Sequence, residues 1–361
     1  MKRYMNIWNQ IGMMITSCLL VLCLFTSCSM IDDDLDNCTQ LDYELQLITN
    51  MTTEVQTQLT AETDVSVASV LRAHLSDIFT DYAHDVDLSF YDTKGDSARL
   101  HHDEHIMDAN QHSYTLYIPR QKYMHLAVAN IVDDPLVDLM YDDRCYTAQV
   151  ALRDLATSRG GESATPDTID SQTTGLFTAR QLMEMIEGIN QTFNVKLYMS
   201  NCAAALVMDP QGHSTDGIKV YSTGFATAFN IADSSYVFSN PSPIVRTKLL
   251  HRESENDNLT FCSVTFPSRE PSATRTVIET EEPFIAQPDE NALWELRVYV
   301  PQSDGTITET VLRVKEPLRA GQLKIIMCRI GSNGGIEVDG GSSEVSTSVT
   351  LDWKDGLEIE T

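Results

Sequence analysis

Short stretches in which apolar and polar residues alternate recur from residue 41 almost to the end of the chain. Residues 41–49 (LDYELQLIT), 113–119 (SYTLYIP) and 307–314 (ITETVLRV) are examples. A period of two residues is typical of a half-buried β-strand. Turn signals such as Asp304-Gly305 and Asn333-Gly334 separate these stretches. Many short strands at regular spacing favour a mainly β chain built from β-sandwiches.

Apolar residues at helical spacing predict one short helix in the N-terminal domain. They are Val67, Val70, Leu71, Leu75, Ile78 and Phe79, with Asp64 as a candidate cap. Leu182 to Ile189 is a second candidate for a short helix. We place a domain boundary near residues 187–192, which gives an N-terminal β-sandwich domain over 41–190 and a C-terminal one over 191–361. Residues 157–174 are small and polar, which indicates a loop whose role the sequence does not reveal.

The charge of the chain excludes one large class of partners. Among its 361 residues, 52 acids stand against 25 bases, and the formal net charge is −27. A nucleic-acid binder needs a basic face that displaces counterions, and binding to anionic lipid headgroups needs one as well. We therefore expect no nucleic-acid partner, and we interpret the charge as that of a solvated surface.

The N-terminus has the three-part layout of a secretory signal. Lys2 and Arg3 supply positive charge, residues 11–25 are apolar, and Thr26-Ser27-Cys28 ends the run. The apolar part is shorter than the ~20 residues that a membrane-spanning helix needs. We predict a lipoprotein signal peptide over residues 1–27, cleaved after Ser27, followed by an acidic lipidated leader over residues 28–40.

Cys28 is the predicted lipidation site. Two small residues followed by cysteine end a bacterial lipoprotein signal, and residues 25–28 fit this pattern. Residues 15–18 fit it too, but cleavage there would leave almost no apolar core before the cut and an exposed apolar tail after it. Ordinary cleavage near Ser27, with Cys28 free or in a disulfide, is the other alternative. Several acyl chains on Cys28 would anchor the protein stably in a membrane.

The other cysteines form no metal or redox motif. The chain has eight cysteines, and none are paired at CxxC spacing. Cys262 and Cys328 lie in strand-like runs, so we expect them to be small buried residues. Cys38 and Cys145 lie outside the most apolar runs and form a candidate disulfide.

The sequence contains no recognisable catalytic motif, so we expect no enzymatic activity, no cofactor and no metal. Residues 101–108 (HHDEHIMD) carry metal-ligand side chains, but Glu104 is misplaced for an HExxH site. We expect this segment to be a solvated loop rather than a metal site. A G-x-S-x-G elbow is missing, and the Gly-rich stretches at 331–335 and 340–341 lack the Lys-Ser/Thr of a phosphate loop.

Several motifs together resemble the FimB/Mfa-type fimbrial anchor lipoproteins of Bacteroidales. CSMIDDDLDNC at residues 28–38 resembles their lipidated start, and DVDLSFYDTKGD followed by YTLYIPRQKYMHLAVAN resembles their N-terminal domain. Residues 293–353 resemble their C-terminal domain most closely, through Pro317-Leu318, Ala320-Gly321 and residues 348–353. The likeness covers most of the mature chain, and its motifs are structural.

This resemblance implies two tandem transthyretin-like β-sandwich domains and a non-enzymatic role. It implies a fimbrial subunit held by lipid in the outer membrane at the base of a fimbrium, where it supports adhesion and joins stalk or accessory subunits. The acidic residues 32–34 after Cys28 resemble a signal for display on the outer surface in lipoproteins of the Bacteroides type. Thr39, where many members have Pro, and residues 157–174 depart from the family and weaken assignment to any one member.

Subunits of such fibres join by strand exchange, a form of β-augmentation. A polymerising subunit loses its own first strand by proteolysis, and an anchor cannot do so without releasing its lipid. We therefore expect residues 41–49 to be kept and the C-terminal stretch to be the donor strand. Its candidate residues are Val349, Leu351 and Trp353, which could equally fill the protein's own core.

Other functions remain open at this point. A surface lipoprotein of similar build that binds glycan or another ligand usually exposes aromatic residues on a sheet face. Here Trp294 and Trp353 both lie in strand patterns, which favours a place in the core. A fimbrial tip subunit is a further alternative, and a secreted hydrolase is the least favoured because the motif searches fail.

Overall fold

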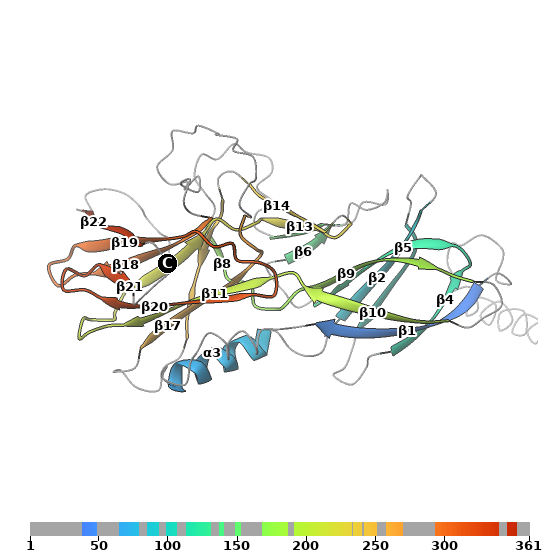
Figure 1. Ribbon diagram of the computed structural model, residues 1–361, viewed down its shortest axis with the longest axis horizontal. Coiled ribbons are helices and arrows are strands. Elements are labelled where there is room, and N and C mark those ends of the chain that lie inside the picture. Colours follow the sequence, from blue (N-terminus) through green and yellow to red (C-terminus); the bar gives the residue numbers. More distant parts are fainter. Residues whose placement is uncertain are drawn as a thin grey trace, which may run out of the picture.

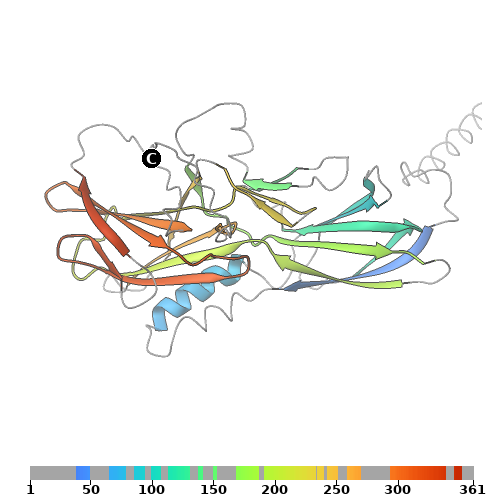
Figure 2. The ribbon, with the colours of Figure 1, turned by 45° about the horizontal axis from the view of Figure 1, so that its top comes forward.

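The computed structural model describes an elongated molecule in which two β-rich lobes lie end to end (Figure 1). The first described strand, β1 (Cys38–Ile48), starts at one end of the long axis, and the last, β22 (Val345–Leu351), lies near the other end (Figure 2). The described residues are 38–48, 65–78, 85–93, 99–106, 113–130, 137–140, 149–152, 168–186, 191–232, 234–239, 242–250, 258–269, 293–338 and 345–351.

The N-terminal lobe is built on one seven-stranded sheet of order β3-β2-β5-β9-β10-β1-β4. β1 runs parallel to β10 and antiparallel to β4. The sheet is curled, because Tyr43 of β1 touches His125 of β5 although two strands separate them in the sheet. The other strands are β2 (Asp85–Asp92), β3 (Arg99–Ile106), β4 (Ser113–Pro119), β5 (Lys122–Ala129), β9 (Phe177–Glu184) and β10 (Gln191–Met199).

The C-terminal lobe packs a five-stranded sheet, β16-β17-β11-β20-β21, against a six-stranded sheet, β22-β19-β18-β12-β15-β8. Apolar side chains from both sheets, including Trp294, Leu206 and Ile326, form the core between them. The bounds are β8 (Thr168–Asp170), β11 (Cys202–Asp209), β12 (Lys219–Thr223), β15 (Ile244–Arg246), β16 (Lys248–Leu249), β17 (Leu259–Thr265), β18 (Trp294–Pro301), β19 (Ile307–Val314), β20 (Leu323–Ile330) and β21 (Ile336–Val338).

A small four-stranded sheet joins the lobes on one side. Its order is β14-β13-β7-β6, with β6 (Val137–Met140), β7 (Gln149–Leu152), β13 (Ala228–Asn230) and β14 (Ser235–Val237). Phe229 of this sheet packs in one cluster with Leu126 and Val128 of the N-terminal sheet and with Phe266 and Val245 of the C-terminal lobe. The two lobes therefore share a buried apolar contact.

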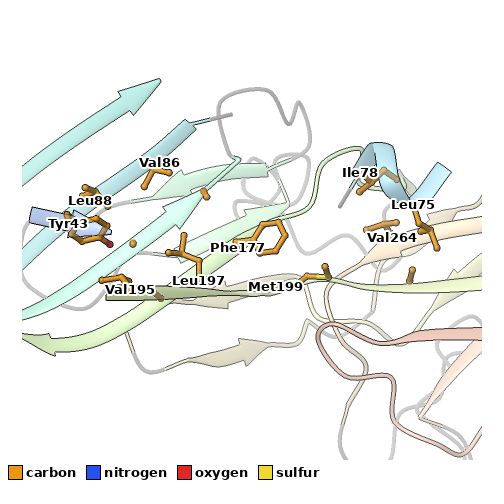
Figure 3. Close-up of a cluster of buried hydrophobic side chains, with 14 of the residues drawn as sticks. Tyr43, Leu75, Ile78, Val86, Leu88, Phe177, Val195, Leu197, Met199 and Val264 are labelled. Carbon is orange, nitrogen blue, oxygen red and sulfur yellow. The ribbon is translucent and has the colours of Figure 1, made fainter. Parts of the chain in front are cut away.

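The predicted helix forms as α3 (Val65–Ile78), but it does not pack inside the N-terminal sheet. Its buried residues Leu75 and Ile78 lie over the five-stranded sheet of the C-terminal lobe, beside Val264 (Figure 3). Alternate residues of β11 make this possible. Ala203, Ala205 and Val207 belong to the cluster under the helix, whereas Cys202, Ala204, Leu206 and Met208 belong to the sandwich core. Strand alternation thus gives one central strand two apolar faces.

Most predicted strands are present, including the stretches at 41–49, 113–119 and 307–314. The candidate helix at Leu182–Ile189 is wrong, since residues 182–184 end β9 and pair with β5. The alternating apolar stretch at residues 193–209 forms two strands, β10 and β11. They are separated at Ser200-Asn201, where the chain passes from one lobe to the other. The domain boundary near 187–192 stays a prediction, and β10 falls after it while pairing in the N-terminal sheet.

The chain is mainly β, and its packed sheets are those expected of β-sandwich domains. Among the described residues, no helix is both long and apolar enough to cross a membrane.

Candidate functional site

The first and last strands are the candidate functional elements, and β1 is held on both sides. It pairs with β10 over Leu41–Ile48 and with β4 over Cys38–Glu44. Leu41 and Tyr43 are fully buried in the core of the lobe. On the polar face of the strand, Asp42 accepts a hydrogen bond from the hydroxyl of Thr115 at 3.4 Å. Pairing and burial together make β1 an interior strand of its sheet.

Tyr43 also connects β1 to β5, on the opposite side of the lobe. Its hydroxyl lies 2.7 Å from Nε2 of His125, and Nδ1 of His125 lies 3.0 Å from the carbonyl oxygen of Ser89. A carbonyl can only accept, so Nδ1 carries the hydrogen and Nε2 accepts the one that Tyr43 donates. The imidazole stacks on Phe90, with ring centroids 4.4 Å apart.

Burial keeps this pair uncharged. It lowers the pKa of His125 from 6.5 to about 4, although the hydrogen bond to Ser89 and the charge of Asp87 act in the opposite direction. Burial, with a smaller contribution from Tyr114, raises the pKa of Tyr43 well above its usual range. Both side chains are therefore neutral at neutral pH, and the hydrogen bond between them is maintained.

Among the described strands, β22 is paired on one side only. It is the edge strand of the six-stranded sheet, and its pairing partner in that sheet is β19. Val349 lies opposite Glu309 and Leu351 opposite Ile307, with a register shift between Thr310 and Val311. The two predicted donor residues thus sit in a strand that pairs within its own lobe, while Trp353 lies outside the described residues.

Both strands lie along the long axis, and each has one of its termini at an end of the molecule. Cys38 pairs with Pro119, beside the β4–β5 turn at one end of the long axis (Figure 1). Leu351 pairs with Ile307, beside the β18–β19 turn at residues 302–306. We call these ends the N-terminal pole and the C-terminal pole. β1 runs inward from the first, and β22 runs outward to the second.

Polar groups fix the joint between the lobes at Ser200-Asn201. The N–H of Leu176 donates to Oδ1 of Asn201 at 2.6 Å, and the N–H of Gly321 donates to the carbonyl of Asn201 at 2.7 Å. The hydroxyl of Tyr236 donates to the carbonyl of Ser200 at 2.8 Å. Since Asn201 is fully buried, these bonds have no competition from water. They connect the start of β9 to the start of β20.

Several predicted site residues lie where the structure cannot test them. Cys28, Ser27 and Cys145 are outside the described residues. Cys38 begins β1, but its side chain is not described, so the disulfide stays a prediction. The structure therefore tests neither the lipidation site nor the disulfide pair. Of the three candidate donor residues, it describes Val349 and Leu351.

The histidine-rich segment is a strand and not the solvated loop predicted from its composition. Residues 101–106 lie in β3, which pairs with β2 along most of its length. The imidazole of His101 contacts the carboxylate of Asp103, and that of His102 lies 2.9 Å from the carboxylate of Asp87. Within the part of the chain that the structure describes, no three His, Cys, Asp or Glu residues gather into a metal-binding group.

The described cysteines are structural. Cys262 and Cys328 are buried, as predicted, and so is Cys202, and none of these three forms a disulfide. Burial raises the pKa of the Cys202 and Cys262 thiols to about 12. Both thiols are therefore protonated at neutral pH, which makes them poor nucleophiles.

Sequence reasoning missed the polar groups that hold the fold together. His125 stands in an apolar run, YMHLAVA, where a lone polar residue indicates a buried hydrogen bond. Glu295 is another example, since it is only 2% exposed and lies 3.2 Å from the guanidinium nitrogens of both Arg297 and Arg313. Trp294 beside it is buried, as predicted, and its indole N–H donates to the carbonyl of Glu316 at 3.0 Å.

No family model and no curated protein matches the sequence. Solved structures of similar architecture include a candidate polysaccharide-binding protein from Bacteroides thetaiotaomicron, at 10% identity and a TM-score of 0.48 over 86% of this chain and 98% of that one. A candidate adhesin from Bacteroides ovatus has 12% identity and a TM-score of 0.47 over 88% and 98%. The fimbrial anchor protein Mfa2 from Porphyromonas gingivalis has 10% identity and a TM-score of 0.42 over 88% and 98%. At this level of similarity, function is inferred from the chain's own geometry.

Proposed function

We propose that this chain is a non-enzymatic fimbrial subunit that anchors a fimbrium to the outer membrane. A lipid on Cys28 holds its N-terminal side in the membrane, with the two lobes at the cell surface. The two lobes are tandem transthyretin-like β-sandwiches. The C-terminal strand joins the neighbouring stalk or accessory subunit by strand exchange, and the assembly supports adhesion.

One observation carries this proposal, namely the unequal pairing of the two strands at opposite poles. β1 starts at the N-terminal pole and is bonded on both sides, so a tether that precedes it pulls on an interior strand. β22 ends at the C-terminal pole and is bonded on one side. An edge strand offers unpaired backbone groups to another chain and leaves its sheet more easily than an interior strand does.

The lipid tether is tested by metabolic labelling with a palmitate analogue in cells that express the wild type or Cys28→Ala. We expect label on the wild type and none on the variant, with the unlabelled variant lost from the outer membrane fraction. Cys38→Ala is the matched control, and it keeps the label. Label that persists in Cys28→Ala would place the lipid elsewhere.

The donor strand is tested by deleting residues 350–361. We expect the shortened protein to be folded, lipidated and exposed, and fimbriae to detach from the cells. Capture from outer membranes separates the alternatives, because a fimbrial anchor retains a ladder of fimbrial subunits whereas a glycan-binding lipoprotein retains soluble glycan. Unchanged attachment of fimbriae to cells with the deletion would defeat the donor assignment.

A further inference from the structure

A pull between the two poles acts along β1 and β22, and not across them. Both strands run lengthwise, since Cys38 pairs beside the β4–β5 turn and Leu351 beside the β18–β19 turn. The hydrogen bonds of a β-ladder lie across the strands. A force along a strand therefore loads all of its bonds at once, instead of opening them one after another from an end.

We infer that β1 is a mechanical clamp, and that the Tyr43–His125 contact sets its strength. This inference rests on the proposed function in one respect, which is that the load enters on the N-terminal side of β1. The clamp itself is a property of the fold. It follows from the direction of β1, from its two neighbours and from the buried hydrogen bond that crosses the lobe (Figure 3 shows Tyr43 among the core residues).

The clamp resists sliding because Tyr43 is connected beyond its own neighbours. Its hydroxyl donates to His125 of β5, and His125 in turn donates to Ser89 of β2. Moving β1 by one residue breaks this chain inside a core where no water replaces the lost partner. The same slip would turn the buried Leu41 toward the solvent face, because strand residues alternate between faces.

β22 is the weaker of the two loaded strands. Within the described part of the sheet it has β19 as its one neighbour, and the pairing is interrupted at Thr310/Val311. Under tension we expect β22 to leave its sheet while β1 holds. A load that is too large for the C-terminal strand then releases that strand first and preserves the membrane-side half of the molecule.

Single-molecule force spectroscopy tests this order of events. The full-length chain carries peptide tags inserted after Ser29 and after Thr361, and it is stretched between them. Release of β22 frees a segment of about 4 nm contour length, residues 339–351, and release of β1 frees one of about 9 nm, residues 38–64, at ~3.4 Å per residue. Each observed step is this length less the distance that the segment spans in the fold. We expect β22 to be released first and β1 at higher force.

Two matched substitutions test the contact. Tyr43→Phe removes the hydroxyl that reaches His125, and we expect the lifetime of β1 at constant force to fall roughly fivefold, which corresponds to one hydrogen bond. Tyr299→Phe removes a hydroxyl that donates to Glu309 at 2.9 Å in the C-terminal lobe, away from β1, and we expect the lifetime of β1 to be unchanged. Release of β1 before β22, or equal effects of the two substitutions, would overturn the clamp. Neither result depends on lipid or fimbriae, so the clamp and the proposed anchor can fail separately.

Discussion

β1 and β22 are both terminal strands that run to a pole of the molecule, yet the fold treats them differently. β1 pairs with β10 and β4, and its Tyr43 is bonded across the lobe to His125. β22 pairs with β19 alone at the edge of its sheet. Under the proposed function, β1 stays in place and β22 is given to a partner. Such a division suits a subunit that is tethered at one end and assembled at the other.

Proline substitution in β1 is the change from which we expect the largest loss of stability. Over residues 41–44 β1 has a strand on each side, so Asp42→Pro removes a ladder hydrogen bond there, and little side-chain packing is lost on the polar face. We expect a loss of about 3 kcal/mol in the free energy of unfolding, the upper end of the cost of a buried acceptor left without its donor, measured by urea denaturation.

The counterpart is a pair of prolines at neighbouring positions of β22, Ser348→Pro and Val349→Pro. Successive N–H groups point to opposite sides of a strand, so one of the two faces the edge. We expect at least one of these variants to differ from the wild type by less than about 1 kcal/mol. Equal damage in both strands would mean that β22 is as firmly held as β1.

Substitution at the joint between the lobes is expected to cause the next largest loss of stability. Asn201→Ala leaves the N–H of Leu176 buried without its acceptor, and we expect this to lower the free energy of unfolding by about 2 kcal/mol. The variant keeps the bond from Gly321, which goes to the backbone carbonyl of residue 201, and loses the side-chain bond at the joint, so we expect the lobes to unfold less cooperatively and the calorimetric transition to broaden. Thr178→Ala, at the neighbouring hydroxyl pair with Ser200, serves as a milder control.

The pH dependence of stability sharpens the comparison on the β1 side. The unfolded chain protonates His125 near pH 6.5, whereas the folded chain does so only near pH 4. The unfolded state therefore binds more protons in this window, and stability falls as the pH is lowered through it. Between pH 7 and pH 5 we expect His125 to account for a loss of about 2 kcal/mol.

His125→Gln isolates this contribution from the other titrating groups. The loss of stability on going from pH 7 to pH 5 should be smaller in this variant by the same amount, in chemical denaturation at both pH values. Wild type and variant with parallel pH profiles would show that the imidazole is not held neutral by the fold.

Local pattern was enough to predict most strands and the helix, because each has its own period of apolar residues. Val67, Leu71 and Leu75 specify a helix with one apolar stripe, but nothing in the stripe says which sheet it covers. In the structure the stripe packs against the C-terminal lobe, because Ala203 and Ala205 leave a shallow surface there. The partner of a helix is a long-range property that one segment does not encode.

The candidate site shows the same limit. The sequence indicated which stretches are terminal strands, but not that β1 would be interior and β22 an edge, since sheet order depends on pairing between distant segments. His101–Asp108 was predicted as a loop because its residues are polar, and tertiary pairing with β2 overrides that preference. The link between Tyr43 and His125 spans residues far apart in the sequence, so only the curled sheet reveals it.

Reversible locking of each terminal strand tests the account most directly. Thr308 and Thr350 are register partners of β19 and β22, and Asp42 and Thr115 are register partners of β1 and β4. Cysteines at directly paired positions are close enough to form a disulfide. Thr308→Cys with Thr350→Cys locks β22 into its own sheet, and Asp42→Cys with Thr115→Cys locks β1.

The measurement is the fraction of cells that retain fimbriae, with and without a mild reductant. We expect cells with locked β22 to lose their fimbriae and to regain them when the disulfide is reduced during assembly, while cells with locked β1 match the wild type throughout. Cells with locked β22 that keep their fimbriae would contradict the account, because the strand would then never need to leave its own lobe.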